Sequence, residues 1–449
     1  MSSDDCFKLP NLSFNMLSEI LKYLTIKELC CVSGVCKKLN AASELDVLWK
    51  DLFPHKKSGK QKKQHLSAKK RITQNIFEKA SETYILEGHS DMITHLTLND
   101  SELISSSRDS TACVWDLQKM RARTLSGHSN WVLSGHRFPC GIVTTSSDKT
   151  IRIWGEKEEC KVIRAHKKPI NCSKKINDRH LVTGGYDNSV KVWDTKSGKC
   201  KFVFEGLISH VNSLAFDNNL VAANPGLTNE VCVWDYHSGQ EVYHVNPNQA
   251  IPNRFGFANG FKSIYMKHPL LFAGENNKVK VWDLRVNTQV GTAPIPTRLL
   301  KSMNITADRN PRGVFKTILC EDNNTLAVGA AGLCGLLTFD MRKMKQALYL
   351  SVHDYPILDL DTGRDVLSHL AATTGTTTYY QYEIAVFDLN NPREKNIKLI
   401  PGHKAVVTSL EIGDDFIVTG AKDGGLRAMA FKMNRQRLKR TQTAKKIRC

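Results

Sequence analysis

GHSNWVLSGHRFPCGIVTTSSDKTIRIW, residues 127–154, contains the pattern that decides the fold. The segment opens with a Gly-His pair that ends at His128, continues through two apolar runs to a turn at Asp148, and closes on Trp154. The same order recurs on both sides of this segment. Self-similarity at a fixed period indicates a repeat architecture, in which each unit is too small to bury its own apolar surface.

The closing tripeptides of the repeats organise most of the chain. Five contain tryptophan and three are weaker: Val114-Trp115-Asp116, Ile153-Trp154-Gly155, Val192-Trp193-Asp194, Val233-Trp234-Asp235, Val281-Trp282-Asp283, Phe339-Asp340, Phe387-Asp388 and Met429-Ala430. Consecutive endings are 39 to 57 residues apart, close to the ~40–45 residues of a propeller blade made of four short strands. The pattern predicts a mainly β fold, a propeller of eight blades. Seven blades is the alternative, because the repeats between 284 and 388 are degenerate.

The beginnings of the repeats carry a second signal. They are Gly88-His89, Gly127-His128, Ala165-His166 and Gly402-His403. With the Trp-Asp endings, these pairs resemble the WD-repeat family. The resemblance implies a buried hydrogen-bonded chain of His, Ser or Thr, Asp and Trp in three repeats: His89, Ser105, Asp109 and Trp115; His128, Thr144, Asp148 and Trp154; His166, Thr183, Asp187 and Trp193. The last repeat has His403, Thr419 and Asp423 but Met429 in place of Trp. Because the sets recur at one spacing, a structural role is favoured over a hydrolase triad, which needs one convergent site.

The segment before the first repeat offers a way to close the ring. Thr83-Tyr84-Ile85-Leu86-Glu87 lies where the family pattern places the outer strand of a blade. We expect it to pair with the strands of residues 405–431, which would remove exposed sheet edges.

Residues 9–53 show a helical rather than a strand pattern. Leu17, Ile20, Leu21 and Leu24 follow i, i+3, i+4, i+7 spacing, and a Thr25-x-x-Glu28 capping box opens a second helix. So small a segment forms a poor independent core, and a partner is expected to cover part of it. From Leu9-Pro10 through Val32-Ser33-x-Val35-Cys36 to Leu48-Trp49 it resembles the F-box motif. The alternative is an ordinary three-helix bundle that caps the propeller.

The F-box resemblance implies docking on the Skp adaptor of cullin-based SCF ubiquitin ligases. The implied contact residues are Leu9, Pro10, Leu17, Ile20, Leu21, Leu24, Leu29, Val32, Val35, Cys36, Leu39 and Trp49. The chain would then be a non-catalytic substrate receptor whose propeller holds targets for ubiquitination and proteasomal degradation. Two alternatives are a non-degradative WD-repeat scaffold and a nucleic-acid-associated protein that uses its basic segments.

The resemblance also implies where a target binds. In the family, residues just before the turn Asp project from one face of the ring; here these are Arg108, Ser147, Tyr186 and Lys422. Arg108 and Lys422 would be neighbours in a closed ring and could bind phosphate. The companion positions, five residues after each His, are Thr94, Leu133, Asn171 and Thr408, none of them Arg. A mixed polar and aromatic peptide site is therefore favoured over a phosphodegron site, with Trp131 as a candidate anchor.

Charge and cysteine usage complete the outline. Of the net charge of +19, +16 lies in residues 54–71 and 432–449, which contain no acidic residue. These segments are interpreted as solvated linker and tail, or as nuclear-import or polyanion contacts. The tail is expected to contribute little to stability. Thirteen scattered cysteines without paired CxxC motifs indicate reduced thiols and no metal site.

These patterns divide the chain into five regions. They are an acidic or polar start (1–8), the F-box (9–53), a basic and partly helical linker (54–82), the propeller (83–431) and a basic tail (432–449). We expect the protein to be located in the cytoplasm, the nucleus or both, with no membrane span and no cofactor. The expected partners are the Skp adaptor, the cullin and target proteins, and nucleic acid is disfavoured as a partner.

Overall fold

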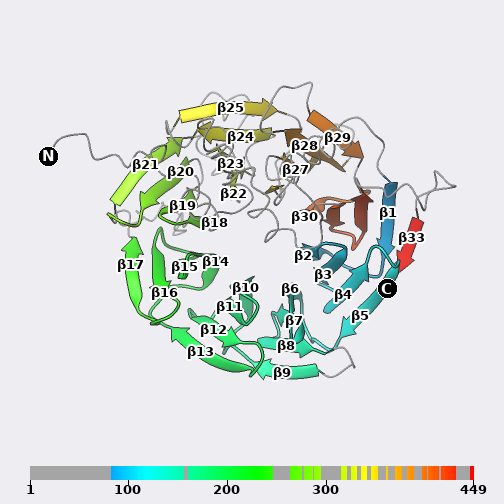
Figure 1. Cartoon of the computed structure of the whole chain (residues 1–449), viewed down its shortest axis with the longest axis horizontal. Helices are drawn as coiled ribbons and strands as arrows, with labels where there is room; N and C mark the ends of the chain where they lie inside the picture. The colour runs from blue at the N-terminus through cyan, green and yellow to red at the C-terminus, as the bar shows by residue number, and fades with distance from the viewer. Residues whose placement is uncertain are drawn as a thin grey trace, which may run out of the picture. The chain divides into compact units, whose positions relative to one another are not determined.

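The computed structural model describes residues 82–155, 160–245, 263–275, 278–286, 288–294, 403–413, 416–430 and 445–449, together with the strands between 315 and 401 that are bounded below. Within these residues the strands form eight sheets. Figure 1 shows the sheets following one another around a ring. The prediction of a mainly β propeller with eight blades is confirmed, and the degenerate repeats between 284 and 388 form blades of their own.

Seven of the eight described blades each contain four consecutive strands, ordered from the inner to the outer edge. The first four of these blades are β2 (Ile93–Asn99), β3 (Glu102–Ser107), β4 (Thr111–Asp116), β5 (Arg121–Ser126); β6 (Val132–Phe138), β7 (Gly141–Ser146), β8 (Thr150–Trp154), β9 (Cys160–Arg164); β10 (Ile170–Lys175), β11 (His180–Gly185), β12 (Val190–Asp194), β13 (Lys199–Phe204); β14 (Val211–Asp217), β15 (Leu220–Pro225), β16 (Val231–Asp235), β17 (Glu241–Val245). The next three are β18 (Ser263–Lys267), β19 (Leu270–Glu275), β20 (Lys278–Asp283), β21 (Thr288–Pro294); β22 (Phe315–Cys320), β23 (Thr325–Ala330), β24 (Gly335–Asp340), β25 (Lys345–Ser351); β26 (Leu360–Thr362), β27 (Leu370–Thr376), β28 (Tyr382–Asp388), β29 (Ile397–Pro401). The eighth blade joins β30 (Val407–Ile412), β31 (Phe416–Ala421) and β32 (Leu426–Ala430) to β1 (Glu82–Glu87) and β33 (Lys445–Arg448).

The burial of each strand follows its place in the blade. Every residue of β7 and β15 is buried, whereas β9, an outer strand, has no buried residue. The second strands can be buried on both faces because neighbouring blades cover them, which suits their runs of small and β-branched residues. The core is therefore divided among the gaps between blades. One such cluster joins Leu125 of the first blade to Val132 and Trp154 of the second.

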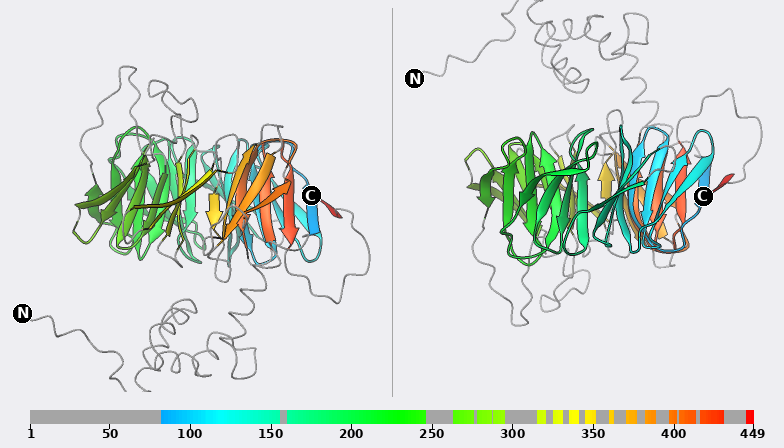
Figure 2. Two further views of the ribbon diagram at one scale, coloured as in Figure 1. Left: turned by 90° about the horizontal axis from the view of Figure 1, so that it is seen from above. Right: turned by 90° about the horizontal axis from the view of Figure 1, so that it is seen from below.

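The ring is closed by residues that are distant in sequence. β1 pairs antiparallel with β32, with Thr83 opposite Met429 and Leu86 opposite Leu426, so the predicted pairing with residues 405–431 is confirmed. The innermost strand β30 also contacts β2. Closure leaves the ring without an open first or last blade. Figure 2 shows the strands running between two opposite faces of the ring, where the connecting loops gather.

The expectation that residues 432–449 form only a solvated tail is wrong for the last part of the sequence. β33 pairs parallel with β1 as the fifth strand of its sheet. Ile447 is 3% exposed and joins the cluster that contains Leu86. The backbone N–H of Cys449 donates to the carbonyl of Glu87 at 2.8 Å. Burial of one isoleucine and pairing with β1 bind this segment to the propeller although its composition is basic.

Changing Ile447 to Asp should lower the free energy of unfolding by about 2–3 kcal/mol, because a fully buried isoleucine is lost and a carboxylate is placed among apolar side chains. Urea unfolding followed by circular dichroism measures the change. Arg448→Ala is the matched control: its side chain is 80% exposed, so it should shift stability by less than about 0.5 kcal/mol. An Ile447→Asp midpoint equal to that of the parent would fit a solvated tail instead.

Candidate functional site

Five equivalent pairs of loop residues line one face of the ring, and we call these ten residues the rim row. In each pair, one residue donates its backbone N–H to the carbonyl of the other, which precedes the innermost strand of the blade, at 2.8 to 2.9 Å. The donor and acceptor pairs are Arg108 and Met92, Ser147 and Trp131, Tyr186 and Pro169, Gly226 and His210, and Lys422 and Val406. This repeated bond holds the two loops of each blade together, so the predicted positions before the turn Asp share one face.

Two stacked pairs join neighbouring blades along the rim row. The guanidinium carbon of Arg108 lies 4.1 Å from the centre of a Trp131 ring. Tyr186 stacks on His210 with ring centres 4.7 Å apart and planes at 9°. Trp131 and Tyr186 are each 43% exposed. Such contacts hold flat side chains in place while leaving much of their surface in water, which suits them to stack on a bound peptide.

The face that carries the rim row has more exposed cationic side chains than the positions before the turn Asp alone provide. Lys422 is exposed, and so are Lys167 and Lys168, which immediately precede Pro169. Exposed Asp91 lies in the corresponding loop of the first blade. The blades of Arg108 and Lys422 are neighbours, since β2 contacts β30, as the sequence predicted. In the structure, however, Arg108 lies against Trp131 of the blade on its other side.

The companion positions have a structural use. Thr94 donates to the carbonyl of Val132 at 2.6 Å, and Thr408 donates to that of Ile93 at 2.7 Å. Asn171 donates to the carbonyl of the next blade's innermost strand at 2.8 Å. These side chains connect innermost strands of adjacent blades, so their polar groups already have partners and are poor candidates for target binding.

The predicted His–Asp chains are present in three blades. His128 contacts Asp148 at 2.7 Å through Nδ1 and Thr144 at 2.8 Å through Nε2, and Trp154 Nε1 donates to the same Thr144 hydroxyl at 2.8 Å. The sets of His89 and His166 repeat this geometry with distances of 2.8 to 2.9 Å. In the last blade His403 Nε2 contacts Thr419 at 2.8 Å, and the buried Met429 replaces the tryptophan.

These chains are structural rather than catalytic. The hydroxyl-bearing residues Ser105, Thr144 and Thr183 are each 0% exposed, so a substrate cannot reach them. Burial lowers the pKa of His128 below the usual 6.5. Burial raises the pKa of Asp148, but hydrogen bonds from Thr150 and His128 outweigh it and leave the value below 3.8. Neutral His and ionised Asp are thus favoured. Their contribution to stability is present at neutral pH and is lost as the pH falls, first below 6.5 for the histidine and then below 3.8 for the carboxylate.

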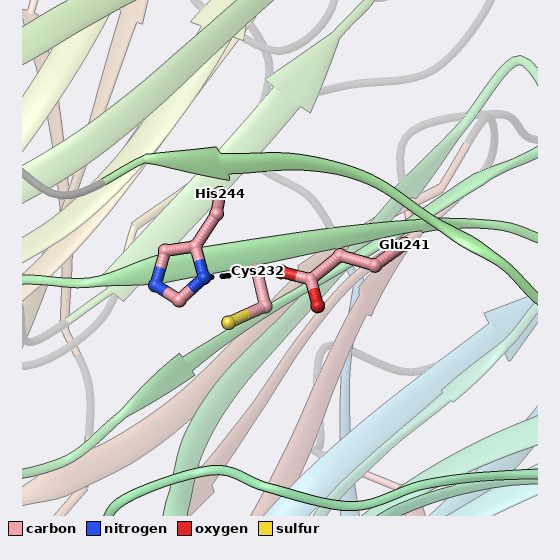
Figure 3. A group of neighbouring side chains, drawn as sticks. All are labelled: Cys232, Glu241 and His244. Atoms are coloured by element: carbon pink, nitrogen blue, oxygen red, sulfur yellow. Dashed lines mark ion pairs between the residues drawn. The ribbon is translucent and has the colours of Figure 1, made fainter.

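One group of side chains in the described residues has donor atoms suited to a metal. Cys232, Glu241 and His244 each offer one, and these atoms lie within 4.8 Å of one another. The group lies on β16 and β17 (Figure 3). The described cysteines, from Cys113 to Cys449, are free thiols. In the described part of the chain, no helix has the length and apolarity needed to cross a bilayer.

The predicted adaptor contacts lie outside the described residues. They are Leu9, Pro10, Leu17, Ile20, Leu21, Leu24, Leu29, Val32, Val35, Cys36, Leu39 and Trp49. The regions 1–8 and 9–53, and all of 54–82 except its last residue, also fall outside them.

Sequence reasoning missed the part of the rim row contributed by the fourth blade. His210 stacks on Tyr186, and Ile208 and Leu227 nearby are 67% and 49% exposed. This repeat has Leu207 and Leu227 where the others have His and Asp, so its loops could not be aligned by motif. The Val233-Trp234-Asp235 ending was the only signal for the blade.

Comparisons with known proteins recover both parts of the chain. A family model described as F-box-like matches residues 15–55. A second, described as WD domain, G-beta repeat, matches 80–116, 120–155 and 157–194. The crystal structure of the computationally designed Ika8 protein superposes with a TM-score of 0.64 and covers 78% of this chain and 100% of that one. At 22% identity it supports the fold alone.

Curated relatives match parts of the chain. Protein tipD of Dictyostelium discoideum is 29% identical over 141 residues, 28% of this chain and 22% of that protein. The DENN domain and WD repeat-containing protein SCD1 of Arabidopsis thaliana is 24% identical over 243 residues, 49% of this chain and 19% of that protein. Small ribosomal subunit protein RACK1 of Caenorhabditis elegans is 25% identical, with 48% of this chain and 84% of that protein covered. The chain thus spans about a fifth of the length of the first two. The chain thus has an F-box-like segment followed by WD repeats, the domain content of an F-box/WD-repeat protein.

Proposed function

We propose that this chain is the substrate-recognition subunit of a Skp–cullin–F-box ubiquitin ligase. The supporting observation is the combination of an F-box-like segment at 15–55 with a propeller whose rim row exposes aromatic and cationic side chains. F-box segments dock on the Skp adaptor, and the adaptor joins them to the cullin. The propeller is left to hold a target, whose lysines are ubiquitinated and which is then degraded by the proteasome.

In this role the chain contributes proximity and no catalytic residue. Holding a target beside a ubiquitin-conjugating enzyme converts a bimolecular encounter into an effectively intramolecular one. The protein would act in the cytoplasm, the nucleus or both. A propeller closed by β1 and β33 suits the task, because a rigid ring keeps the rim row at a constant geometry while different targets bind and leave.

The target class that fits the rim row best is a peptide with apolar or aromatic side chains and some negative charge. Trp131 and Tyr186 offer flat surfaces, and Arg108 and Lys422 offer positive charge. A site dedicated to phosphate would need several converging cations, whereas the companion positions are occupied by Thr94, Asn171 and Thr408 in bonds between blades. Phosphorylated targets are the second choice.

The test is purification of the tagged full chain from cells, with a variant in which Leu9 and Pro10 are both changed to Ala. The parent should co-purify with the Skp adaptor and the cullin. The variant should lose most of both, because apolar F-box contacts are removed, while it keeps proteins held by the propeller. Circular dichroism should show the same β signal in both chains.

The outcomes separate the proposed function from its alternatives. A parent that brings down propeller-bound proteins without adaptor or cullin would be a non-degradative scaffold. Association dominated by RNA or DNA, and lost steeply with added salt, would assign the basic segments a nucleic-acid role. Equal adaptor recovery from parent and variant would show that Leu9 and Pro10 do not form the docking surface.

A further inference from the structure

The fourth blade brings together three different metal-binding side chains through its strand register. Cys232 of β16 lies directly opposite His244 of β17. Glu241 and His244 are three residues apart, which in a regular strand would place them on opposite faces. The register shifts between them: Val233 pairs with Tyr243, but Trp234 pairs with Glu241. This bulge adds one residue, Val242, and turns Glu241 to the side of His244 and Cys232, as Figure 3 shows.

Cys232 is buried among apolar side chains, with acidic side chains as its charged neighbours. Cys232 is 4% exposed and lies in an apolar cluster with Phe204 and Trp234. Burial, followed by the charges of Glu241 and Glu230, raises the pKa of Cys232 to about 12. The sulfur is therefore a protonated thiol at neutral pH, and a metal ion that binds there must displace its proton.

The remaining two ligands are accessible and already oriented. His244 Nδ1 lies 3.1 Å from Glu241 Oε1, with side chains 50% and 44% exposed. Both project from β17, the outermost strand of its sheet. A tetrahedral zinc ion with bonds of about 2.0–2.3 Å places its ligand atoms roughly 3.2–3.7 Å apart. Ligand atoms within 4.8 Å of one another would therefore need to approach by about an ångström, which exposed side chains on an outer strand can do by small rotations.

We propose that Cys232, Glu241 and His244 form a zinc-binding site that links β16 to β17. A thiolate, an imidazole and a carboxylate form a donor set that suits Zn²⁺, and Co²⁺ can report on it. On binding, the Cys232 thiol releases its proton to solvent and the sulfur bonds to the ion. Three protein ligands leave a fourth position for water or a side chain of a partner. The ion would fasten the outer edge of the fourth blade, whose inner loop carries His210.

The site is tested on the full chain, reduced and stripped of metal with a chelator. Titration with Co²⁺ should produce a sulfur-to-cobalt charge-transfer band in the near ultraviolet, and added Zn²⁺ should abolish it by competition. Glu241→Ala with His244→Ala should weaken the Co²⁺ affinity that gives this band by at least about tenfold, since two ligands are lost. Both side chains are about half exposed, so this double variant should remain folded, which circular dichroism checks.

The matched control replaces an exposed cysteine and an exposed histidine elsewhere: Cys200→Ser with His237→Ala. This control should bind Co²⁺ as the parent does. No charge-transfer band in the parent, or an equal band and affinity in the Glu241 and His244 double variant, would overturn the proposal. Either result would identify the group as a simple ion pair between Glu241 and His244 beside a buried thiol.

Discussion

Replacing Asp148 with alanine should lower the free energy of unfolding of the propeller by roughly 3–4 kcal/mol. The carboxylate accepts four hydrogen bonds, from His128 Nδ1 at 2.7 Å, the Ser129 backbone at 3.1 Å, the Thr150 backbone at 2.9 Å and the Thr150 hydroxyl at 2.6 Å. The side chains of Asp148 and His128 are 5% and 0% exposed. Alanine would remove the acceptor of all four donors. Ser129 is exposed to water, but His128 is not, and each buried unpaired donor costs about 1–3 kcal/mol.

The measurement is equilibrium unfolding in urea at pH 7, monitored by tryptophan fluorescence and by circular dichroism. Asp178→Ala is the control, because that side chain is 82% exposed and ion-paired only with Lys175 on the surface; its effect should stay within about 0.5 kcal/mol. If Asp148→Ala were no more destabilising than Asp178→Ala, the buried chains would not hold the blades together.

The first three blades could be predicted directly because each uses the same few residues for the same bonds. His128, Asp148 and Trp154 each bond to a fixed partner within one blade. Because these partners stand at fixed places on the strands, the spacing of the residues in the sequence predicts the strand lengths. The pairing of β1 with β32 could be predicted for a related reason: a ring has only one way to cover the edges of its first and last strands.

Three other features, which depend on individual side-chain contacts between blades or across strands, were not predictable. Arg108 and Trp131 meet because two loops from neighbouring blades lie side by side, which neither repeat encodes alone. Cys232, Glu241 and His244 are separated by nine and three residues, a spacing with no metal-site signature; only the bulge in β17 unites them. β33 has a single buried apolar side chain, Ile447, within a basic segment, and such a composition favours the interpretation as a solvated tail.

The second large effect is expected when a rim-row side chain that contacts targets is removed. In the full chain, Trp131→Ala should weaken capture of propeller-bound targets by roughly 2 kcal/mol or more, about thirtyfold, because large aromatic side chains dominate interface energies. Trp131 is 43% exposed and also supports Arg108, so its loss removes a contact surface and releases the guanidinium. Quantitative proteomics of material co-purified with the variant and the parent measures the change.

A second rim variant, Arg108→Glu with Lys422→Glu, separates the two kinds of target. If targets are anionic, reversal of both charges should reduce capture at least as much as Trp131→Ala does, and phosphatase treatment of the parent sample should reproduce the loss if the charge is phosphate. If targets bind mainly through aromatic contacts, the charge reversal should have the smaller effect and phosphatase treatment should have none.

The control is Lys119→Glu with Lys196→Glu. These exposed lysines lie in the turns that follow β4 and β12, at the opposite ends of the strands from the rim row. This control changes net charge equally and should leave capture intact. Equal recovery of the same targets from the parent and both rim variants would place recognition elsewhere on the propeller.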